Sequence, residues 1–305
     1  MPKSPWRDMT PSRENESLSA SDGLRARKNG RWGKDKLSFF DDFVPAALKA
    51  TASKRERHFI DLFAGPGRNI DPATDEEFDG STIRVLRSTA PGDGSLHFTH
   101  AVMVNKDSDD QAALVARVGR LAQSGDCRVP TTRLEFLTDD ANHVVHRIMR
   151  GINQRAYALV FADITRPSHW KWSSVKALRS HGHTSVDLYM LYPLTMAINR
   201  MTSFNARTLA ESGPVLDEFY GTEAWRELTA ERQTQAQSAA LRRALLKLYM
   251  DRLRALGWAH VLVARDVKRT GDAGLYQMIY ASNHPAGGRI AEWSADRPDD
   301  QGSFF

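Results

Sequence analysis

The chain has 305 residues, of which 41% are hydrophobic, and a formal net charge of +5. This length allows a large buried core in one domain or two, and the modest basic charge permits a polyanionic partner such as nucleic acid without requiring one. The single cysteine, Cys127, excludes a disulfide framework and a cysteine-rich metal site. Because no apolar run approaches the roughly 20 residues of a membrane span, and no signal peptide is recognisable, we expect a cytoplasmic protein that binds no metal.

The first 30 residues are rich in Ser, Arg and acidic residues and show no hydrophobic period. This composition predicts a flexible leader over residues 1–30. The residues that follow place apolar side chains at helical spacing. They predict a helix that begins with Asp35 as its N-cap and is kinked or broken at Pro45.

Seven short apolar runs then follow, and each predicts a β-strand. They cover residues 58–63, 97–104, 132–138, 157–163, 185–192, 260–267 and 275–282. Helix-like stretches separate the first five runs, which predicts a parallel sheet covered on both faces. A short glycine-containing stretch joins the last two runs and predicts an antiparallel hairpin. This order favours an α/β, Rossmann-like fold with a mostly parallel, seven-stranded sheet of the methyltransferase type.

We therefore expect one methyltransferase-like domain over residues 31–295, followed by a tail at 296–305. A mostly helical insertion is predicted at 195–258, between the fifth and sixth strands. One side of its last helix is basic. That side either is solvated or contacts phosphate groups.

The first strand ends in an acid, Asp61, and the run Phe63-Ala64-Gly65-Pro66-Gly67 follows it closely. Backbone N–H groups in such a turn can approach a ligand at the carboxyl edge of a sheet. A nicotinamide site would show three glycines as G-x-G-x-x-G, and this run has only two of them. The run resembles the first motif of S-adenosylmethionine (SAM) dependent methyltransferases. The resemblance implies that Asp61 meets the ammonium group of SAM and that residues 63–67 lie against its methionine part. The alternative is a tight turn without a ligand.

Polar residues also follow the second and third strands. Asn105 and Asp107 stand where methyltransferases usually present an acid to the ribose, and an amide accepts fewer hydroxyl hydrogen bonds than a carboxylate. We therefore expect the ribose contact to be weaker at Asn105 or moved to Asp107. Asp140, Ala141 and Asn142 follow the third strand, and they either hold the adenine amino group or cap the next helix.

Several blocks in one order extend the resemblance to most of the chain. They are IDLFAGPGRN at 60–69, FADITRP at 161–167, YPLTMAINR at 192–200 and LDEFYGTEAWREL at 216–228. In these blocks the sequence resembles the three-Cys-motif partner protein family (TcmP). The resemblance implies a class I methyltransferase fold, SAM as the cofactor, and a radical-SAM-like partner protein encoded nearby, which carries the three cysteines of the name.

The acceptor site is expected at the end of the fourth strand, where Asp163 stands. Methyl transfer mainly requires that nucleophile, carbon and sulfur be aligned, so Asp163 is the candidate that positions an N or O nucleophile. Asn199 and Arg200 either form a pocket wall facing the acceptor or start a helix that contacts the insertion. Trp170 and Trp172 either offer a stacking surface to a planar acceptor or pack against the following helix.

Two alternatives stay open, an inactive adaptor and a methyltransferase that modifies nucleic acid. The family's D-P-[FY]-G strand end is replaced by Asp163-Ile164-Thr165-Arg166, which allows a catalytically inactive adaptor of the radical-SAM-like neighbour. The basic charge and the D-L-F-A-G form of the first motif allow a methyltransferase that modifies nucleic acid. The acceptor itself is not readable from the sequence.

Overall fold

The main sheet of the computed structural model has seven strands in the order β10-β11-β9-β8-β3-β6-β7. Residues 17–193, 198, 206–230, 237–268 and 274–295 are described. The strands are β3 (Arg57–Asp61), β6 (His100–Asn105), β7 (Leu134–Thr138), β8 (Tyr157–Ala162), β9 (Val186–Tyr192), β10 (His260–Lys268) and β11 (Gly274–Ser282). The first five are parallel, and β11 lies antiparallel between β9 and β10. The predicted Rossmann-like methyltransferase fold class is therefore confirmed.

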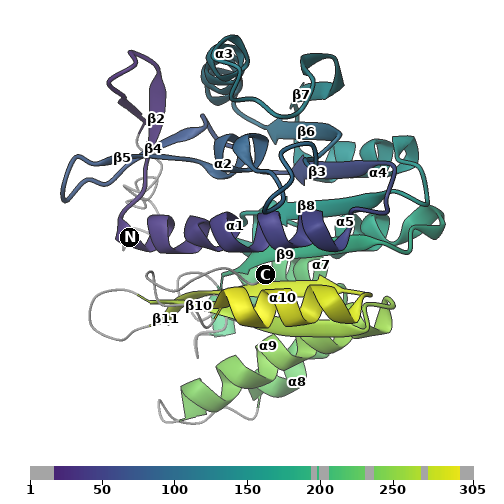
Figure 1. The fold of residues 1–305 in the computed structure, drawn as a ribbon. Coiled ribbons are helices and arrows are strands. Elements are labelled where there is room, and N and C mark those ends of the chain that lie inside the picture. The colour runs from purple at the N-terminus through teal and green to yellow at the C-terminus, as the bar shows by residue number, and fades with distance from the viewer. Residues whose placement is uncertain (1–16, 194–197, 199–205, 231–236, 269–273, 296–305) are drawn as a thin grey trace.

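Helices cover both faces of this sheet (Figure 1). One face carries α1 (Arg31–Ala50), α2 (Ser81–Arg87), α3 (Ser108–Gln123) and α10 (Pro285–Ala295). The other carries α4 (Ala141–Gly151), α5 (Trp172–Leu178), α7 (Ala206–Tyr220), α8 (Trp225–Ala230) and α9 (Gln237–Ala255). Single turns of 3₁₀ helix are η2 (Thr131–Arg133), η3 (Pro167–His169) and η4 (Ser180–Gly182). No helix in the described part of the chain has the length and apolar character needed to cross a membrane.

Each face of the sheet has its own hydrophobic core, because successive side chains of a strand point to opposite faces. In β3, Phe59 belongs to the core beneath α1 and Ile60 to the core beneath α4 and α5. All five residues of β3 are buried, as are all residues of β8 and β9. This explains why the strands read as continuous apolar runs, and it leaves only their ends free to carry polar side chains.

Helix α1 is longer than the sequence predicts. It begins at Arg31, after Gly30 as the N-cap, and runs without a break through Pro45. A proline inside a helix costs one backbone hydrogen bond. Buried apolar residues on both sides of it, Phe40 and Phe43 before it and Leu48 after it, pack on the sheet and hold the helix together. The predicted N-cap, Asp35, and the predicted break are therefore wrong.

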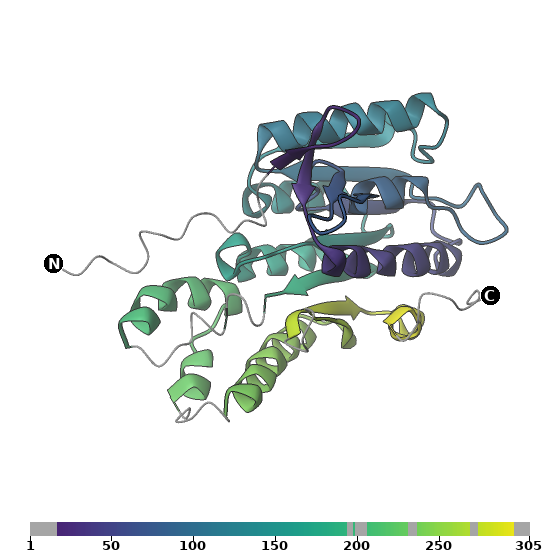
Figure 2. The ribbon, with the colours of Figure 1, turned by 90° about the vertical axis from the view of Figure 1, so that its left-hand side faces the viewer.

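The prediction of a flexible leader is wrong for residues 17–30, while residues 1–16 lie outside the described part. Strands β1 (Ser17–Ser19) and β2 (Arg25–Lys28) form a hairpin. Strand β2 also pairs with β4 (Arg68–Ile70), and β4 pairs with β5 (Glu77–Asp79), which gives a second sheet of order β1-β2-β4-β5. Figure 2 shows this hairpin beside α3, at one end of the molecule.

The hairpin is attached to the main domain mainly by polar contacts. For this reason the sequence of the hairpin shows little hydrophobic pattern. Arg117 of α3 is buried, and its guanidinium donates to both carboxylate oxygens of Asp22 at 2.8 Å. The same group donates to the carbonyl oxygens of Arg25 and Pro66, at 2.7 and 2.6 Å. Arg117 therefore joins the hairpin to the turn that follows β3.

Candidate functional site

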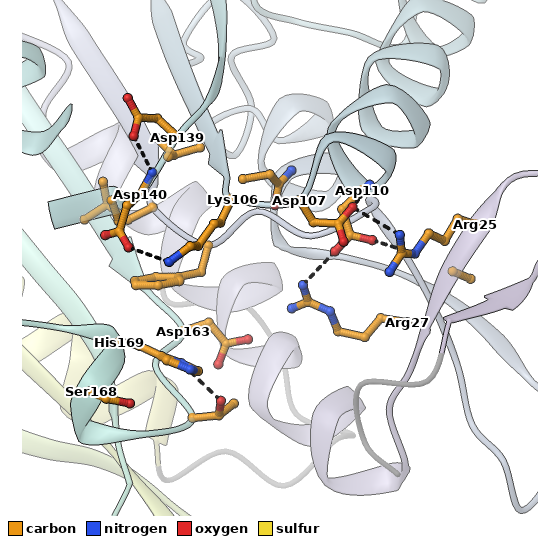
Figure 3. A pocket seen from close by; sticks show the side chains of 17 residues that line it. Arg25, Arg27, Lys106, Asp107, Asp110, Asp139, Asp140, Asp163, Ser168 and His169 are labelled. Carbon is orange, nitrogen blue, oxygen red and sulfur yellow. Dashed lines mark hydrogen bonds and ion pairs between the residues drawn. The ribbon is translucent and has the colours of Figure 1, made fainter. Parts of the chain in front are cut away.

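A cavity of about 390 Å³ lies at the carboxyl ends of β3, β6, β7 and β8. This is the edge at which open α/β sheets bind their ligands. The chain after β3 contributes Phe63, the chain after β6 contributes Lys106 and Asp107, and the chain after β8 contributes Asp163. Figure 3 shows Arg25 and Arg27 reaching toward Asp110 on one side, with Lys106 and Asp140 paired on another. The hairpin that the sequence suggested was flexible therefore forms one wall of the site.

A second, much smaller cavity of about 20 Å³ adjoins the first. Arg27, Phe63 and Asp163 line both. The predicted run from Ala64 to Gly67 lines the smaller one, opposite Lys36 of α1. The structure thus brings the glycine-rich turn and Asp163 to the same place.

The turn after β3 requires its two glycines. Gly65 and Gly67 have φ angles of +62° and +80°, in the left-handed region that favours glycine. A Cβ atom on Gly67 would lie 2.8 Å from Cδ1 of Leu114, and one on Gly65 would lie 3.2 Å from Cζ of Arg27. The backbone is therefore packed closely on both sides, and Arg27 lies directly over the turn.

Asn105 fixes the shape of this turn. Its Oδ1 accepts a hydrogen bond from the Gly65 N–H at 2.6 Å, and its Nδ2 donates to the Gly65 carbonyl at 3.0 Å. Nδ2 also donates to Oε1 of Gln111 at 2.6 Å, so both of its hydrogens are used. Although Asn105 lines the larger cavity, its amide is engaged with the chain itself. Its predicted contact with a ribose stays a prediction.

Asp61 lies behind the turn and not on the cavity walls. Its carboxylate has no exposed surface and accepts hydrogen bonds from the hydroxyls of Ser81 at 2.5 Å and Thr82 at 2.9 Å. Burial raises the pKa of Asp61 to about 6, against the lowering effect of these bonds. Asp61 lines neither cavity, whereas Ser81, which donates to it, lines the smaller one. The predicted contact of Asp61 with an ammonium group stays a prediction.

Asp107 combines two roles at the mouth of the larger cavity. It is the N-cap of α3, accepting from the backbone N–H groups of Asp109 and Asp110. It also forms an ion pair of 3.1 Å with Arg25. The Asp110 N–H is the main cause of the lowered pKa of Asp107, and Arg25 adds to it. The residue therefore presents an ionised carboxylate at the place predicted for a ribose contact.

The predicted residues after β7 serve mainly as a helix cap and a link between loops. Asp140 caps α4 through the Asn142 N–H at 2.9 Å and pairs with Lys106 at 3.0 Å. Burial opposes its ionisation, but these bonds outweigh burial and hold the pKa of Asp140 at about 2. The Asn142 amide donates to the His169 carbonyl and accepts from Ser174. Asp140 and Ala141 line the larger cavity, whereas Asn142 lines neither.

Asp163, at the end of β8, lines both cavities. Its Oδ2 accepts a hydrogen bond of 2.6 Å from Nζ of Lys36, and this lysine is only 1% exposed. Its Oδ1 is buried and receives no hydrogen bond from the described residues. The site thus contains a buried ion pair with one carboxylate oxygen left without a donor.

The loop after β8 buries its two tryptophans. Trp170 has no exposed surface and packs edge-on against Phe63. Trp172 packs edge-on against Tyr249 of α9, and the Arg252 guanidinium lies 4.7 Å from its ring centre. Of the two predicted readings for Trp172, packing against the helices is found. His169 lines the larger cavity instead, and burial is the main cause of its lowered pKa.

Sequence reasoning missed Lys36, Arg25 and Arg27, and it named two residues that the structure does not describe, Asn199 and Arg200. Lys36 had a readable signal. It lies four residues before Phe40 on the apolar face of a predicted helix, where a charged side chain is unusual without a partner. The two arginines had none, because their strand has no hydrophobic pattern.

No protein-family model matches the chain, and no curated protein matches it significantly. Solved structures with some similarity include a Legionella pneumophila protein of the DUF519 family, at 9% identity and a TM-score of 0.47, covering 84% of this chain and 86% of that one. A SAM-dependent O-methyltransferase from Thermotoga maritima has 13% identity and a TM-score of 0.40 (88% and 77% covered), and an rRNA methylase from Streptococcus thermophilus has 9% and 0.37 (78% and 93%). At TM-scores below 0.5 these similarities are too distant to bear on what the chain binds or does.

Proposed function

We propose that the chain is a SAM-dependent methyltransferase that transfers the methyl group to an N or O nucleophile. The observation that carries this proposal is the position of the larger cavity, across the carboxyl ends of four parallel strands and beside the turn at Gly65 and Gly67. A volume of about 390 Å³ is within the range of small-molecule sites. A fold alone implies no activity, so the proposal depends on the site.

The residues present fit SAM as a ligand. SAM would occupy the larger cavity with its methionine part directed toward the glycine turn, whose backbone lacks Cβ atoms and so permits close approach. Asp107 offers an ionised carboxylate for the ribose hydroxyls, and Ala141 offers an apolar surface for the adenine. When bound, SAM supplies a methyl group already activated by a sulfonium, so the chain needs no elaborate acid and base.

The chemical role of this chain is then to align the nucleophile. Oδ1 of Asp163 would accept a hydrogen bond from the N–H or O–H of the acceptor and take the proton that the nucleophile loses on gaining the methyl group. Lys36 holds the other oxygen at 2.6 Å, which fixes the orientation of the carboxylate and balances its charge. Burial keeps water away from both groups.

We further propose that the chain is of the three-Cys-motif partner type and acts with a radical-SAM-like neighbour. The sequence blocks named above support this assignment. One observation favours the rival, an inactive adaptor: Ile164, fully buried, replaces the proline of the family's D-P-[FY]-G strand end, which shapes the loop after the strand. The adaptor would retain the fold without needing the cavity.

Titration calorimetry of the full chain with SAM and S-adenosylhomocysteine tests the enzyme against the adaptor. We expect both ligands to bind with micromolar affinity. The variant Asp107→Asn keeps a side chain that caps helices well and removes the charge, so it should weaken binding about 10-fold. Asp109→Asn is the matched control, because Asp109 also pairs with Arg25 but is not part of the cavity wall. Absence of heat with either ligand at high micromolar concentration would rule out the proposed enzyme.

A further inference from the structure

Two buried oxygen atoms, on residues that line the smaller cavity, lack a donor among the described residues. They are Oδ1 of Asn29 and Oδ1 of Asp163. Asn29 is 6% exposed, and its Nδ2 donates to Oδ1 of Asn69 at 3.2 Å. Asp163 has its other oxygen engaged by Lys36. A buried acceptor without a donor costs free energy, so two of them at one cavity indicate that something else supplies the hydrogens.

The smaller cavity has little room. About 20 Å³ holds one group of the size of a water molecule and excludes a ring or a phosphate. Arg27, Phe63 and Asp163 belong to the walls of both cavities, so the smaller cavity adjoins the larger one. A ligand held in the larger cavity could therefore extend one small group toward Asn29 and Asp163.

The position of Asn29 is fixed by its neighbours in the fold. Its backbone N–H donates to the Ile70 carbonyl at 2.9 Å, which ties it to β4. Its amide lies against α1 at Gly33, where a Cβ atom would come within 2.1 Å of Oδ1. The orphaned oxygen therefore belongs to a preorganised side chain that only a glycine at position 33 permits.

We propose that Asn29 and Asp163 together bind a single primary amino group. Two acceptors require two hydrogens from one water-sized group. Among the groups of this size that a bound ligand could extend here, a hydroxyl carries one hydrogen and a methyl group carries none that it can donate, whereas an amino group carries at least two. The inference rests on the proposed function. It adds Asn29, which lies outside the glycine motif, to the residues of that site. The amino group belongs either to the methyl acceptor, in which case Asp163 has the role proposed above, or to the amino-acid part of SAM, in which case Asp163 binds the cofactor instead; both sources share this chemistry.

Three probes separate these sources by calorimetry. S-Adenosylhomocysteine carries the amino-acid group, 5′-methylthioadenosine lacks it, and sinefungin carries a further amine where SAM has its methylated sulfur. If the pair binds the amino-acid group, Asn29→Ala should weaken S-adenosylhomocysteine and sinefungin about 10-fold and leave methylthioadenosine unchanged. If the pair binds the acceptor amine, the same variant should weaken sinefungin about 10-fold and leave the other two unchanged.

A second variant tests the same oxygen without removing it. Gly33→Ala leaves Asn29 in the chain but displaces its amide, so it should reproduce the pattern of Asn29→Ala. Asn153→Ala, at an exposed asparagine away from both cavities, is the control that should change nothing. Equal loss for all three probes, or no loss for any of them while circular dichroism shows intact folding, would overturn the proposal. Failure of the unaltered chain to bind any probe would instead refute the proposed function, and this inference with it.

Discussion

Nζ of Lys36 lies 2.6 Å from Oδ2 of Asp163, although the two residues are 127 positions apart in the sequence. Lys36 comes from α1 and Asp163 from the end of β8, so the pair joins the first helix to the centre of the site. Both side chains are largely buried, at 2% and 14% exposure. A buried ion pair contributes little net stability, but loss of one partner leaves a charge without compensation.

We expect Lys36→Met to lower the free energy of unfolding by about 3 kcal/mol, because Asp163 would then be a buried charge without a counterion. The double variant Lys36→Met with Asp163→Asn should regain part of this loss, since it removes the stranded charge. Urea denaturation measures both. Lys34→Met is the matched control: Lys34 pairs with Glu76 at 2.6 Å on the surface, with side chains 47% and 52% exposed, and should cost less than about 1 kcal/mol. Equal losses at positions 34 and 36 would contradict the assigned role of burial.

Asn105, the last residue of β6, gives a second prediction, on which the sequence-based expectation and the structure differ. If an acid at position 105 served the ribose, Asn105→Asp would tighten the binding of S-adenosylhomocysteine. In the structure the Asn105 amide donates both its hydrogens, to Gly65 and to Gln111. A carboxylate cannot donate either bond and would face the Gly65 carbonyl oxygen. We therefore expect a loss of about 2 to 4 kcal/mol in stability and weaker binding, measured by denaturation and calorimetry.

A substitution two residues away provides the comparison. Asp107→Asn replaces the half-exposed N-cap of α3, outside the Gly65 network, with another good N-cap residue, so its effect on stability should stay below about 1 kcal/mol. Tighter binding in Asn105→Asp, with stability unchanged, would show that the amide is not required by the turn and that the sequence reading was right.

The strands and their order could be predicted because burial on both faces makes the central strands nearly continuous apolar runs. β8, with six buried apolar residues, is the clearest case. The glycine turn was also readable, since positive φ angles leave few alternatives to glycine. The polar side chains that line the larger cavity could not be predicted. Arg25 and Arg27 reach the cavity through ion pairs with residues more than 80 positions away, and such contacts leave no periodic pattern in the sequence.

Anchoring of the hairpin by Arg117 gives a third prediction. Removal of its guanidinium in Arg117→Ala would leave Asp22 and the carbonyls of Arg25 and Pro66 without their buried donor. We expect faster hydrogen exchange over residues 17–28 with little change in β3 and β8, because the hairpin depends on few apolar contacts. Hydrogen exchange followed by mass spectrometry resolves these segments.

Arg120→Ala is the control for this variant. Arg120 is 56% exposed and lies 3.5 Å from Asp22, so its contribution should be small. A hairpin that exchanges at the same rate in both variants and in the unaltered chain would show that pairing with β4 is enough to hold it.

The last prediction concerns the stability of the fold at acidic pH. His58 at the amino end of the central strand is stacked on His100, with ring centres 4.3 Å apart. Burial, and then the charge of His100, lower the pKa of His58 to about 4 in the folded chain, although Glu56 acts in the other direction. The unfolded chain therefore binds a proton to this residue below pH 6.5, whereas the folded chain does so only near pH 4. Stability should fall as the pH drops from 6.5 to 4, by up to about 3 kcal/mol from this residue.

His58→Phe keeps a flat ring beside His100 and removes the titration, so its free energy of unfolding should fall less steeply over this range. Asp61 acts in the opposite sense: its pKa of about 6 lies above 3.8, so the folded chain takes up a proton first, and stability from this group rises as the pH drops from 6 to 3.8. Comparing the slopes of the two chains cancels the Asp61 contribution, because both contain it. Parallel curves from urea denaturation at several pH values would mean that His58 titrates alike in the folded and unfolded states, and that its burial in β3 has no electrostatic cost.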